Sequence, residues 1–313
     1  MQIVLLLISM VLNIGATDDW PILKGPYLGQ KLPGKTPEIF APGIISTDIL
    51  EGCLGWGNHM EYFIFQRWIN RKPKLYIMNQ TNGVWSIPEL IPFGNKYQVG
   101  DFTIGPDGKT MVFASKIFLD TVGSDGEGGN IWMVKKTETG WTKPKNFGME
   151  INTMHHESYP CLAANGNLYF FSRRPGGYDD SDLYRSKFIA GKYQDPINFG
   201  SKLNTEYHEW DTYIAPDERY MIYCSTKPGG MGSDDLYVTF KKKDGSWCKP
   251  VHMGTKINSH KSENRPYVSP DGKCLFYAST KSGNRDIYWV DAKIIEDLKP
   301  KDPKIRRIIN EKN

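Results

Sequence analysis

Residues 266–279 read PYVSPDGKCLFYAS, and they carry the clearest fold signal in the sequence. It contains a short strand, a Pro-Asp-Gly turn and a second apolar strand, which together are the signature of a β-hairpin. The pattern occurs three more times upstream, with Asn-Gly or Asp-Glu at the turn in two of the copies. The upstream copies are residues 102–115, 160–172 and 212–225. Internal repetition of this kind predicts a repeat architecture.

Each hairpin is followed by two more strand-like segments. A third strand is predicted to begin at Asn130, Asp182, Asp235 and Asp286. A fourth, outer strand is predicted after a Gly-containing turn, at residues 141–144, 193–196 and 247–250. Since the units recur at roughly 50-residue intervals and each holds four strands, each unit reads as one blade of a β-propeller.

A fifth, degenerate unit lies upstream, with its strand-turn at residues 53–58 and its outer strand at 85–88. The last unit ends at Val290 without an outer strand of its own. Residues 37–40 resemble residues 144–147 but follow no blade, so we expect them to pair with the last blade and close the ring. Closure removes exposed sheet edges. The sequence therefore predicts an all-β propeller of five four-stranded antiparallel blades, or of six if residues 17–36 and the tail add one.

This pattern resembles the WD40-like repeats of TolB-type β-propellers. The resemblance covers residues 37–290 and rests on the Pro-Asp-Gly turn, the Pro-Gly-Gly loop and the Asp-Leu/Ile-Tyr strand. It implies the fold, but the family spans periplasmic assembly factors, binding modules, and propeller domains attached to peptidases or acting on sugars. TolB itself has a separate N-terminal α/β domain, and no such domain is expected from this sequence, so the resemblance does not extend to a Tol–Pal-type role.

The two ends differ from the repeat region. Residues 2–14 form an uncharged apolar run, which is shorter than the about 20 residues that span a bilayer. We interpret residues 1–16 as a signal peptide and expect export to the periplasm or the extracellular space; a buried N-terminal strand is the alternative. Residues 17–36 are expected to form an N-terminal arm, and residues 291–313 a basic tail with a short helix.

Composition excludes several classes of protein. The 313 residues carry 39 Lys and Arg against 35 Asp and Glu, a net charge of +4, which is too even for a dedicated nucleic-acid binder. No transmembrane segment is expected. The five cysteines show neither zinc-site spacing nor a disulfide framework, and Cys161, Cys224 and Cys274 lie in apolar runs typical of a core.

Candidate site residues emerge when the units are aligned on the turn. Three glutamates occupy equivalent positions near the start of the first strand. Two residues further along, the aligned units hold different side chains, which are Asp101, Tyr159, Asp211 and Arg265. The first strand lines the central channel of a propeller, so we expect these side chains to meet at one rim. The predicted ligand-binding set is Glu157, Tyr159, Glu209, Trp210, Asp211, Glu263 and Arg265.

The predicted set contains residues that are repeated in several blades and residues that differ between blades. A residue repeated in three blades favours a blade-fixing role, whereas residues that differ between blades are better candidates for a specific ligand. In the loops before the third strands, we also expect Asp182, Asp235 and Asp286 to bond back to the serines at the loop starts. Those serines are Ser172, Ser225 and Ser279.

These observations favour an exported, non-catalytic module that binds a ligand or a protein. Its partner would be a small molecule such as a carbohydrate, or a protein of the cell envelope. The alternative is a glycoside hydrolase or polysaccharide lyase that uses two of the acidic residues at the channel mouth, helped by Arg265 or a histidine. No cofactor or metal is expected, with Ca²⁺ at the acid ring or the acidic loop 120–127 as the alternative.

Overall fold

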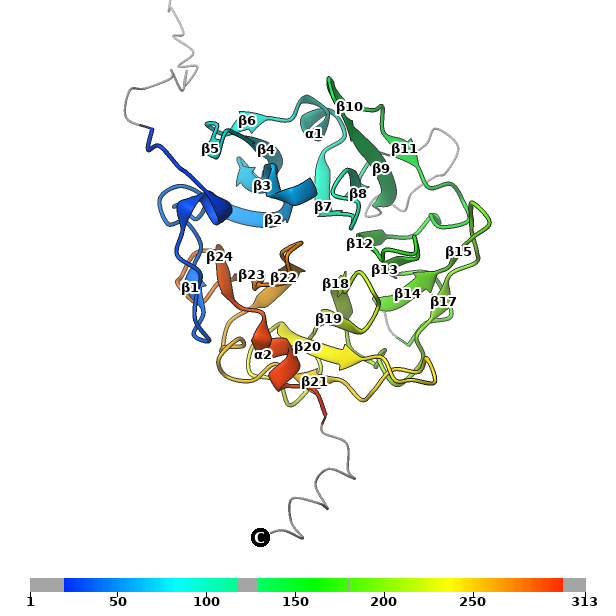
Figure 1. The fold of residues 1–313 in the computed structure, drawn as a ribbon. Coiled ribbons are helices and arrows are strands. Elements are labelled where there is room, and N and C mark those ends of the chain that lie inside the picture. The colour runs from blue at the N-terminus through cyan, green and yellow to red at the C-terminus, as the bar shows by residue number, and fades with distance from the viewer. Residues whose placement is uncertain (1–19, 118–128, 179–180, 301–313) are drawn as a thin grey trace, which may run out of the picture.

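The chain folds into a ring of five antiparallel sheets around a central axis (Figure 1). The structure is a computed structural model that describes residues 20–117, 129–178 and 181–300. The predicted five-bladed β-propeller is confirmed, and the blades follow one another in chain order around the ring. The predicted signal peptide, the acidic loop 120–127 and most of the basic tail lie outside the described residues.

The inner three strands of each blade are long and well paired. They are, blade by blade, β2 (Leu50–Trp56), β3 (Tyr62–Ile69) and β4 (Lys72–Thr81); β7 (Val99–Ile104), β8 (Thr110–Ser115) and β9 (Asn130–Thr137); β12 (Glu157–Leu162), β13 (Leu168–Ser172) and β14 (Asp182–Ser186); β18 (Glu209–Ile214), β19 (Tyr220–Ser225) and β20 (Asp235–Phe240); β22 (Glu263–Val268), β23 (Cys274–Ser279) and β24 (Asp286–Asp291). Each first strand contains a register shift against the second strand. Such β-bulges re-aim side chains, here at the channel.

The outer strands are short and lie later in the chain than predicted. They are β6 (Glu89–Leu90), β11 (Lys145–Asn146), β17 (Ile197–Asn198) and β21 (Val251–His252). Each begins directly after a proline that closes the segment predicted as the strand, because proline has no N–H to donate to a ladder. The segments before the prolines instead form small hairpins, with β5 (Val84–Trp85), β10 (Gly140–Trp141) and β16 (Lys192–Tyr193) pairing β4, β9 and β15 (Phe188–Ile189).

The ring closes as predicted. Strand β1 (Glu38–Ile39) pairs with β24 and supplies the outer strand of the last blade. Directly after it, Phe40 is fully buried and packs against Phe276 and Trp289 of blade 5 and Phe63 of blade 1, with ring centroids 5.0–5.9 Å apart. The N-terminal segment therefore joins the first and last blades by both pairing and packing.

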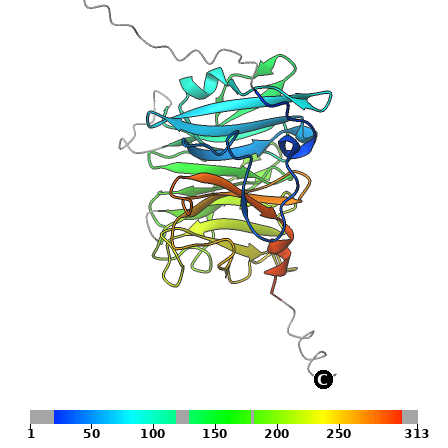
Figure 2. The same cartoon turned by 90° about the vertical axis from the view of Figure 1, so that its left-hand side faces the viewer.

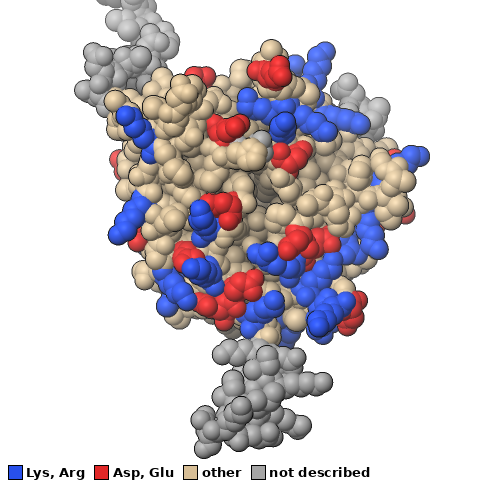
Figure 3. All heavy atoms as spheres, viewed as in Figure 1, with Lys and Arg blue, Asp and Glu red and all other residues tan. Residues whose placement is uncertain are grey.

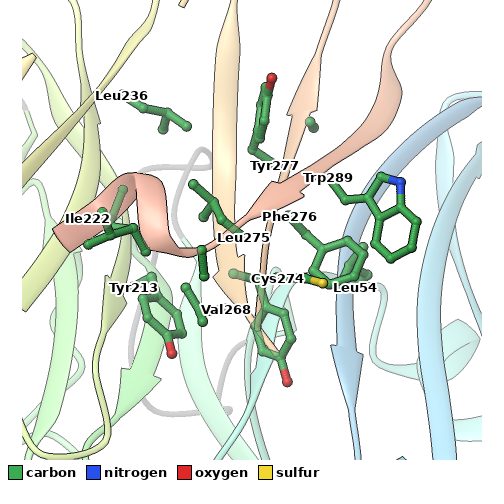
Figure 4. Packing of buried hydrophobic residues seen from close by; sticks show 14 of the residues in the cluster. Leu54, Tyr213, Ile222, Leu236, Val268, Cys274, Leu275, Phe276, Tyr277 and Trp289 are labelled. Atoms are coloured by element: carbon green, nitrogen blue, oxygen red, sulfur yellow. The ribbon is translucent and has the colours of Figure 1, made fainter. Parts of the chain in front are cut away.

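The core lies between neighbouring blades. Figure 4 shows Tyr213 and Ile222 of blade 4 and Leu54 of blade 1 converging on the central strand of blade 5, around Leu275 and Phe276. The cysteines predicted as core residues, Cys161, Cys224 and Cys274, are buried, and all five cysteines are free thiols.

The two faces of the ring carry different connections. The turns between first and second strands lie on one face, which we call the turn face; the loops between second and third strands lie on the other, the loop face. The short helices η1 (Pro26–Gly29) and α2 (Lys293–Asp297) lie together on one side of the ring (Figure 2). Tyr27 donates a hydrogen bond to Asp271 and Arg219 lies 3.6 Å from Glu296, which places both helices on the turn face.

Two further short helices complete the described elements, η2 (Asn58–Met60) and α1 (Pro92–Lys96). Across the described ranges, no helix has the length and apolar character needed to cross a membrane.

Candidate functional site

The repeated glutamates are buried inside their own blades. Each carboxylate accepts hydrogen bonds from the backbone N–H and the hydroxyl of a Thr or Ser four residues earlier, at 2.6–3.2 Å. In three blades it also accepts from the serine that ends the second strand. The glutamates are Glu51, Glu157, Glu209 and Glu263, and all four are fully buried.

Basic side chains of the same blades balance some of this buried charge. Arg174 lies 3.5 Å from Glu157, and Arg67 lies 3.7 Å from Glu51. Burial nevertheless raises the pKa of Glu51 to about 7, against the opposing hydrogen bonds of Thr47 and the charge of Arg67. Burial also raises the pKa of Glu209. These contacts fit the blade-fixing interpretation, because every one of the four carboxylates is bound by donors of its own blade; Oε2 of Glu51 has no hydrogen-bond partner.

The loop aspartates have partners other than those predicted. Ser225 donates to Glu209, so its hydroxyl proton is not available to Asp235. Asp235 instead accepts from the backbone N–H groups of Met231 and Gly232, and thereby fixes the glycine-rich loop of blade 4. The prediction that Asp235 bonds back to Ser225 is therefore wrong, because the buried glutamate competes for the serine.

The residues that differ between blades do meet, at the bulges of the first strands. Tyr159, Asp211 and Arg265 occupy the bulge of blades 3, 4 and 5, and all three have positive φ angles of 49–54°. Positive φ is uncommon for residues other than glycine and often marks strained positions at functional sites. With Asp101 of blade 2 and Cys53 of blade 1 they form what we call the channel ring.

Contacts within the channel ring centre on Arg265. Its backbone N–H donates to Asp211 Oδ2 at 2.9 Å, its Nη2 lies 3.6 Å from Asp101 Oδ1, and its guanidinium lies over the Tyr159 ring at 5.6 Å. Ser158 donates a further hydrogen bond to Asp101 at 2.8 Å. The ring therefore joins four blades through charge and hydrogen bonds.

Burial controls the ionisation of this group. It raises the pKa of Asp211 to about 7, although the charge of Arg265 opposes the shift. Burial alone would lower the pKa of Arg265, but Tyr159, Asp101 and Asp211 together raise it above its usual value. The ring therefore holds a permanent cation next to one carboxyl group that titrates near neutral pH.

Trp210, the remaining predicted residue, lies beside this ring. It is half-buried, and its indole stacks on the imidazole of His208 with centroids 5.4 Å apart and planes 3° from parallel. The stacking therefore holds its aromatic ring in place, and Trp210 does not line the two cavities of the channel, one of about 960 Å³ and one of about 20 Å³.

A large open space at the centre of the ring was not predicted from the sequence. A funnel of about 960 Å³ lies on the turn face, and its walls come from the second halves of the first strands and from the turns of all five blades. Tyr213 and Tyr267 form part of its wall, while Pro106, Pro216 and Pro270 lie around its rim. Figure 3 views this face and shows charged side chains of both signs around the hollow centre. A smaller cavity of about 20 Å³ lies between the funnel and the channel ring.

A fourth member of the glutamate set was also missed. Glu51 is displaced from the alignment because the turn of blade 1 is degenerate, but Thr47 stands four residues before it, as Thr153 stands before Glu157. This hydroxyl-to-glutamate spacing is the signal that would have found it.

The described residues hold no group of three or more His, Cys, Asp or Glu side chains placed to bind a metal ion. The acidic loop 120–127, where Ca²⁺ was considered, is not among them.

Comparison with known proteins places the fold. No family model matches the sequence, and no curated protein matches it. Among solved structures, the chain is similar to a thermostable family-43 glycoside hydrolase, with a TM-score of 0.53, 13% identity, and coverage of 79% of this chain and 90% of that chain. It is also similar to an α-L-arabinofuranosidase from Lactobacillus brevis, with a TM-score of 0.51, 13% identity, and coverage of 79% and 91%.

TolB from Acinetobacter baumannii matches with a TM-score of 0.46 and 14% identity over 79% of this chain. The chain spans about half of TolB, 55% of its length. At these identities the likeness shows the propeller fold alone.

Proposed function

We propose that this chain is a non-catalytic ligand-binding propeller whose ligand sits in the funnel of the turn face. The funnel volume of about 960 Å³ is in the range of small-molecule and cofactor clefts. Its wall combines aromatic rings, apolar side chains and exposed turn backbone, which suits a ligand with both apolar faces and polar groups. Loops of different sequence held on a rigid ring are a common physical basis for binding.

The observation that carries this proposal is that the carboxylates near the channel are bound by other groups of the protein. Each of the four repeated glutamates accepts hydrogen bonds from donors of its own blade, and Arg265 contacts both Asp101 and Asp211. Two carboxylates line the funnel, and both are held by neighbours: Asp217 accepts from Arg219, and Asp271 accepts from Tyr27 and Ser269. Acid–base hydrolysis requires a pair of carboxyl groups that exchange protons with the substrate, whereas binding requires none.

The class of ligand and the compartment are part of the same proposal. A carbohydrate fits the mixed wall of the funnel, and a protein of the cell envelope is the other partner we propose, in line with the resemblance to WD40-like TolB-type repeats. Export is supported by the apolar run 2–14, and the compartment would be the periplasm or the extracellular space.

A thermal-shift screen of the purified chain against oligosaccharides, peptides and divalent ions tests the proposal. A ligand that binds only the folded state raises its stability by about 2.7 kcal/mol at a hundredfold excess over Kd. Ala164→Trp places an indole at the funnel rim and should abolish the shift, while Gln194→Trp, exposed on the outer edge of the same blade, should leave it unchanged. A shift that survives Ala164→Trp would place the ligand elsewhere.

One observation favours a second candidate, a carbohydrate-active enzyme. Asp211 has a pKa near 7, the range that a general acid or base needs, and it lines the cavity below the funnel. Turnover of arabinose-containing or other oligosaccharides that is lost in Asp211→Asn, with binding retained, would establish this candidate over the binding module.

A further inference from the structure

The cavity between the funnel and the channel ring, which we call the neck, combines apolar walls with several buried polar groups. Its volume is about 20 Å³, and its wall includes Asp211, Thr212, Tyr159 and Arg265. Tyr267 and Thr103 line both the neck and the funnel, so the two spaces adjoin.

Two buried polar atoms of this lining have no hydrogen-bond partner in the protein. They are Nε of Arg265, whose side chain is 10% exposed, and Oγ1 of Thr212, which is 3% exposed. The other contacts of the guanidinium are accounted for: Nη1 donates to Asn264 at 2.9 Å and Nη2 lies 3.6 Å from Asp101. A buried donor without an acceptor costs free energy, so we expect a hydrogen-bond partner from outside the chain here.

The volume and the charges restrict that partner. A space of about 20 Å³ holds one group of the size of a water molecule. A full anion would face Asp101 and Asp211, and a cation would face Arg265. A neutral hydroxyl avoids both problems, because its oxygen accepts from Arg265 Nε–H while its proton is donated to Asp211 or Thr212.

We propose that the neck binds a single hydroxyl group: a water molecule in the free protein, and a hydroxyl of a polyhydroxylated ligand, a neutral sugar, when the funnel is occupied. This rests on the proposed function and specifies its ligand. A ligand hydroxyl that replaces the water can make the same hydrogen bonds. A ligand group that cannot make them binds more weakly. The neck would therefore select ligands with a free hydroxyl at the end that enters deepest.

The experiment measures affinity by calorimetry for neutral oligosaccharides, their fully O-methylated counterparts and neutral peptides, on the wild type and on Thr212→Val. Valine keeps the shape of threonine and removes the hydroxyl. The sugar that binds the wild type should bind Thr212→Val about 5-fold more weakly, which corresponds to one lost hydrogen bond. Its O-methylated counterpart should bind the wild type more weakly still, since the neck has no room for the added methyl.

A matched variant separates a loss of binding from a loss of folding. Thr239→Val removes the hydroxyl of another buried threonine of blade 4, one that donates to Cys248 at 2.9 Å away from the channel. It should lower the melting temperature and leave sugar affinity unchanged. Thr212→Val should leave the melting temperature of the free protein within a degree or two of wild type, because its hydroxyl has no protein partner to lose.

The outcomes are distinguishable. Equal affinity of the wild type and Thr212→Val for the sugar, or of the sugar and its O-methylated counterpart for the wild type, would overturn the neck proposal and leave the funnel as a binding site. Binding of peptides alone, blocked by Ala164→Trp, would do the same. Binding of no compound in the funnel would overturn the proposed function, and the neck proposal with it.

Discussion

Glu209 lies among three donors of its own blade, the Thr205 N–H and hydroxyl and the Ser225 hydroxyl, at 2.7–2.8 Å. A carboxylate accepts from all three, whereas an amide at the same place turns an N–H₂ group toward one of them. Its position near the channel would make Glu209 a candidate for catalysis. Its hydrogen bonds, however, are all to its own blade, so we assign it a structural role.

Glu209→Gln should therefore lower the free energy of unfolding by about 2 kcal/mol or more, because it leaves a buried donor without an acceptor. Equilibrium urea unfolding measures the loss, and ligand affinity should stay as in the wild type. Glu206→Gln, an exposed neighbour in the same turn, should leave stability unchanged. Lost affinity or turnover with unchanged stability in Glu209→Gln would contradict the structural role.

Asp211 gives a pH dependence with a defined sign. Because burial raises its pKa in the folded state to about 7, the folded protein holds this proton more tightly than the unfolded chain does. The stabilising contribution is thus complete below pH 4 and is lost as the pH rises through 7. Asp211→Asn removes this loss while keeping an oxygen for the Arg265 N–H.

Relative to the wild type, Asp211→Asn should accordingly gain stability between pH 5 and pH 8, by about 2–3 kcal/mol. Urea unfolding at both pH values measures this difference. Glu51, the other acid with a pKa near 7, is present in both proteins and cancels in the comparison. Parallel stability curves for the two proteins would show that the pKa of Asp211 is not raised by folding.

At the scale of the element, strand β1 and the phenylalanine after it close the ring. Phe40 is fully buried between blades 1 and 5. Phe40→Ala should cost about 3–5 kcal/mol, the usual cost of truncating a buried aromatic side chain. Thermal unfolding measures this, with Ile22→Ala as the control, since Ile22 is 75% exposed. A small effect of Phe40→Ala would mean that the ring does not depend on this closure.

The elements also show what the sequence could predict. The hairpin repeat and the match between residues 37–40 and 144–147 were enough for five blades and for closure. The outer strands were misplaced by a few residues, because the aromatic residue that marks each segment precedes a proline, and pairing resumes only after the proline. The pattern of hydrophobic residues does not show where a backbone N–H is missing, whereas the position of each proline does, and it therefore indicates where the outer strand begins.

For the site, the sequence predicted the level of the ring at which Tyr159, Asp211 and Arg265 meet. It could not show which way the glutamates point, because that depends on the bulge and on a hydroxyl four residues earlier. It could not show the funnel either. The funnel wall is made of backbone and of side chains such as Tyr213 and Tyr267, each ordinary within its own blade, and becomes a site only when the turns of all the blades are brought together.

At the level of the whole molecule, the five blades surround a channel that widens into the funnel on the turn face, and the polar side chains of the channel ring contact one another across it. A ligand in the funnel must contact several blades at once, since each blade contributes only a short part of the wall. This separates funnel binding from binding at an outer edge, where one or two blades would suffice.

Hydrogen–deuterium exchange, measured with and without the compound that most raises the melting temperature, shows whether the ligand lies in the funnel. We expect slower exchange at the turns of four blades together, in residues 104–108, 161–166, 213–220 and 267–272, with the loop face unchanged. Slower exchange confined to the loop face, in residues 173–178, 226–234 and 280–285, or to the outer strands of one blade, would contradict it.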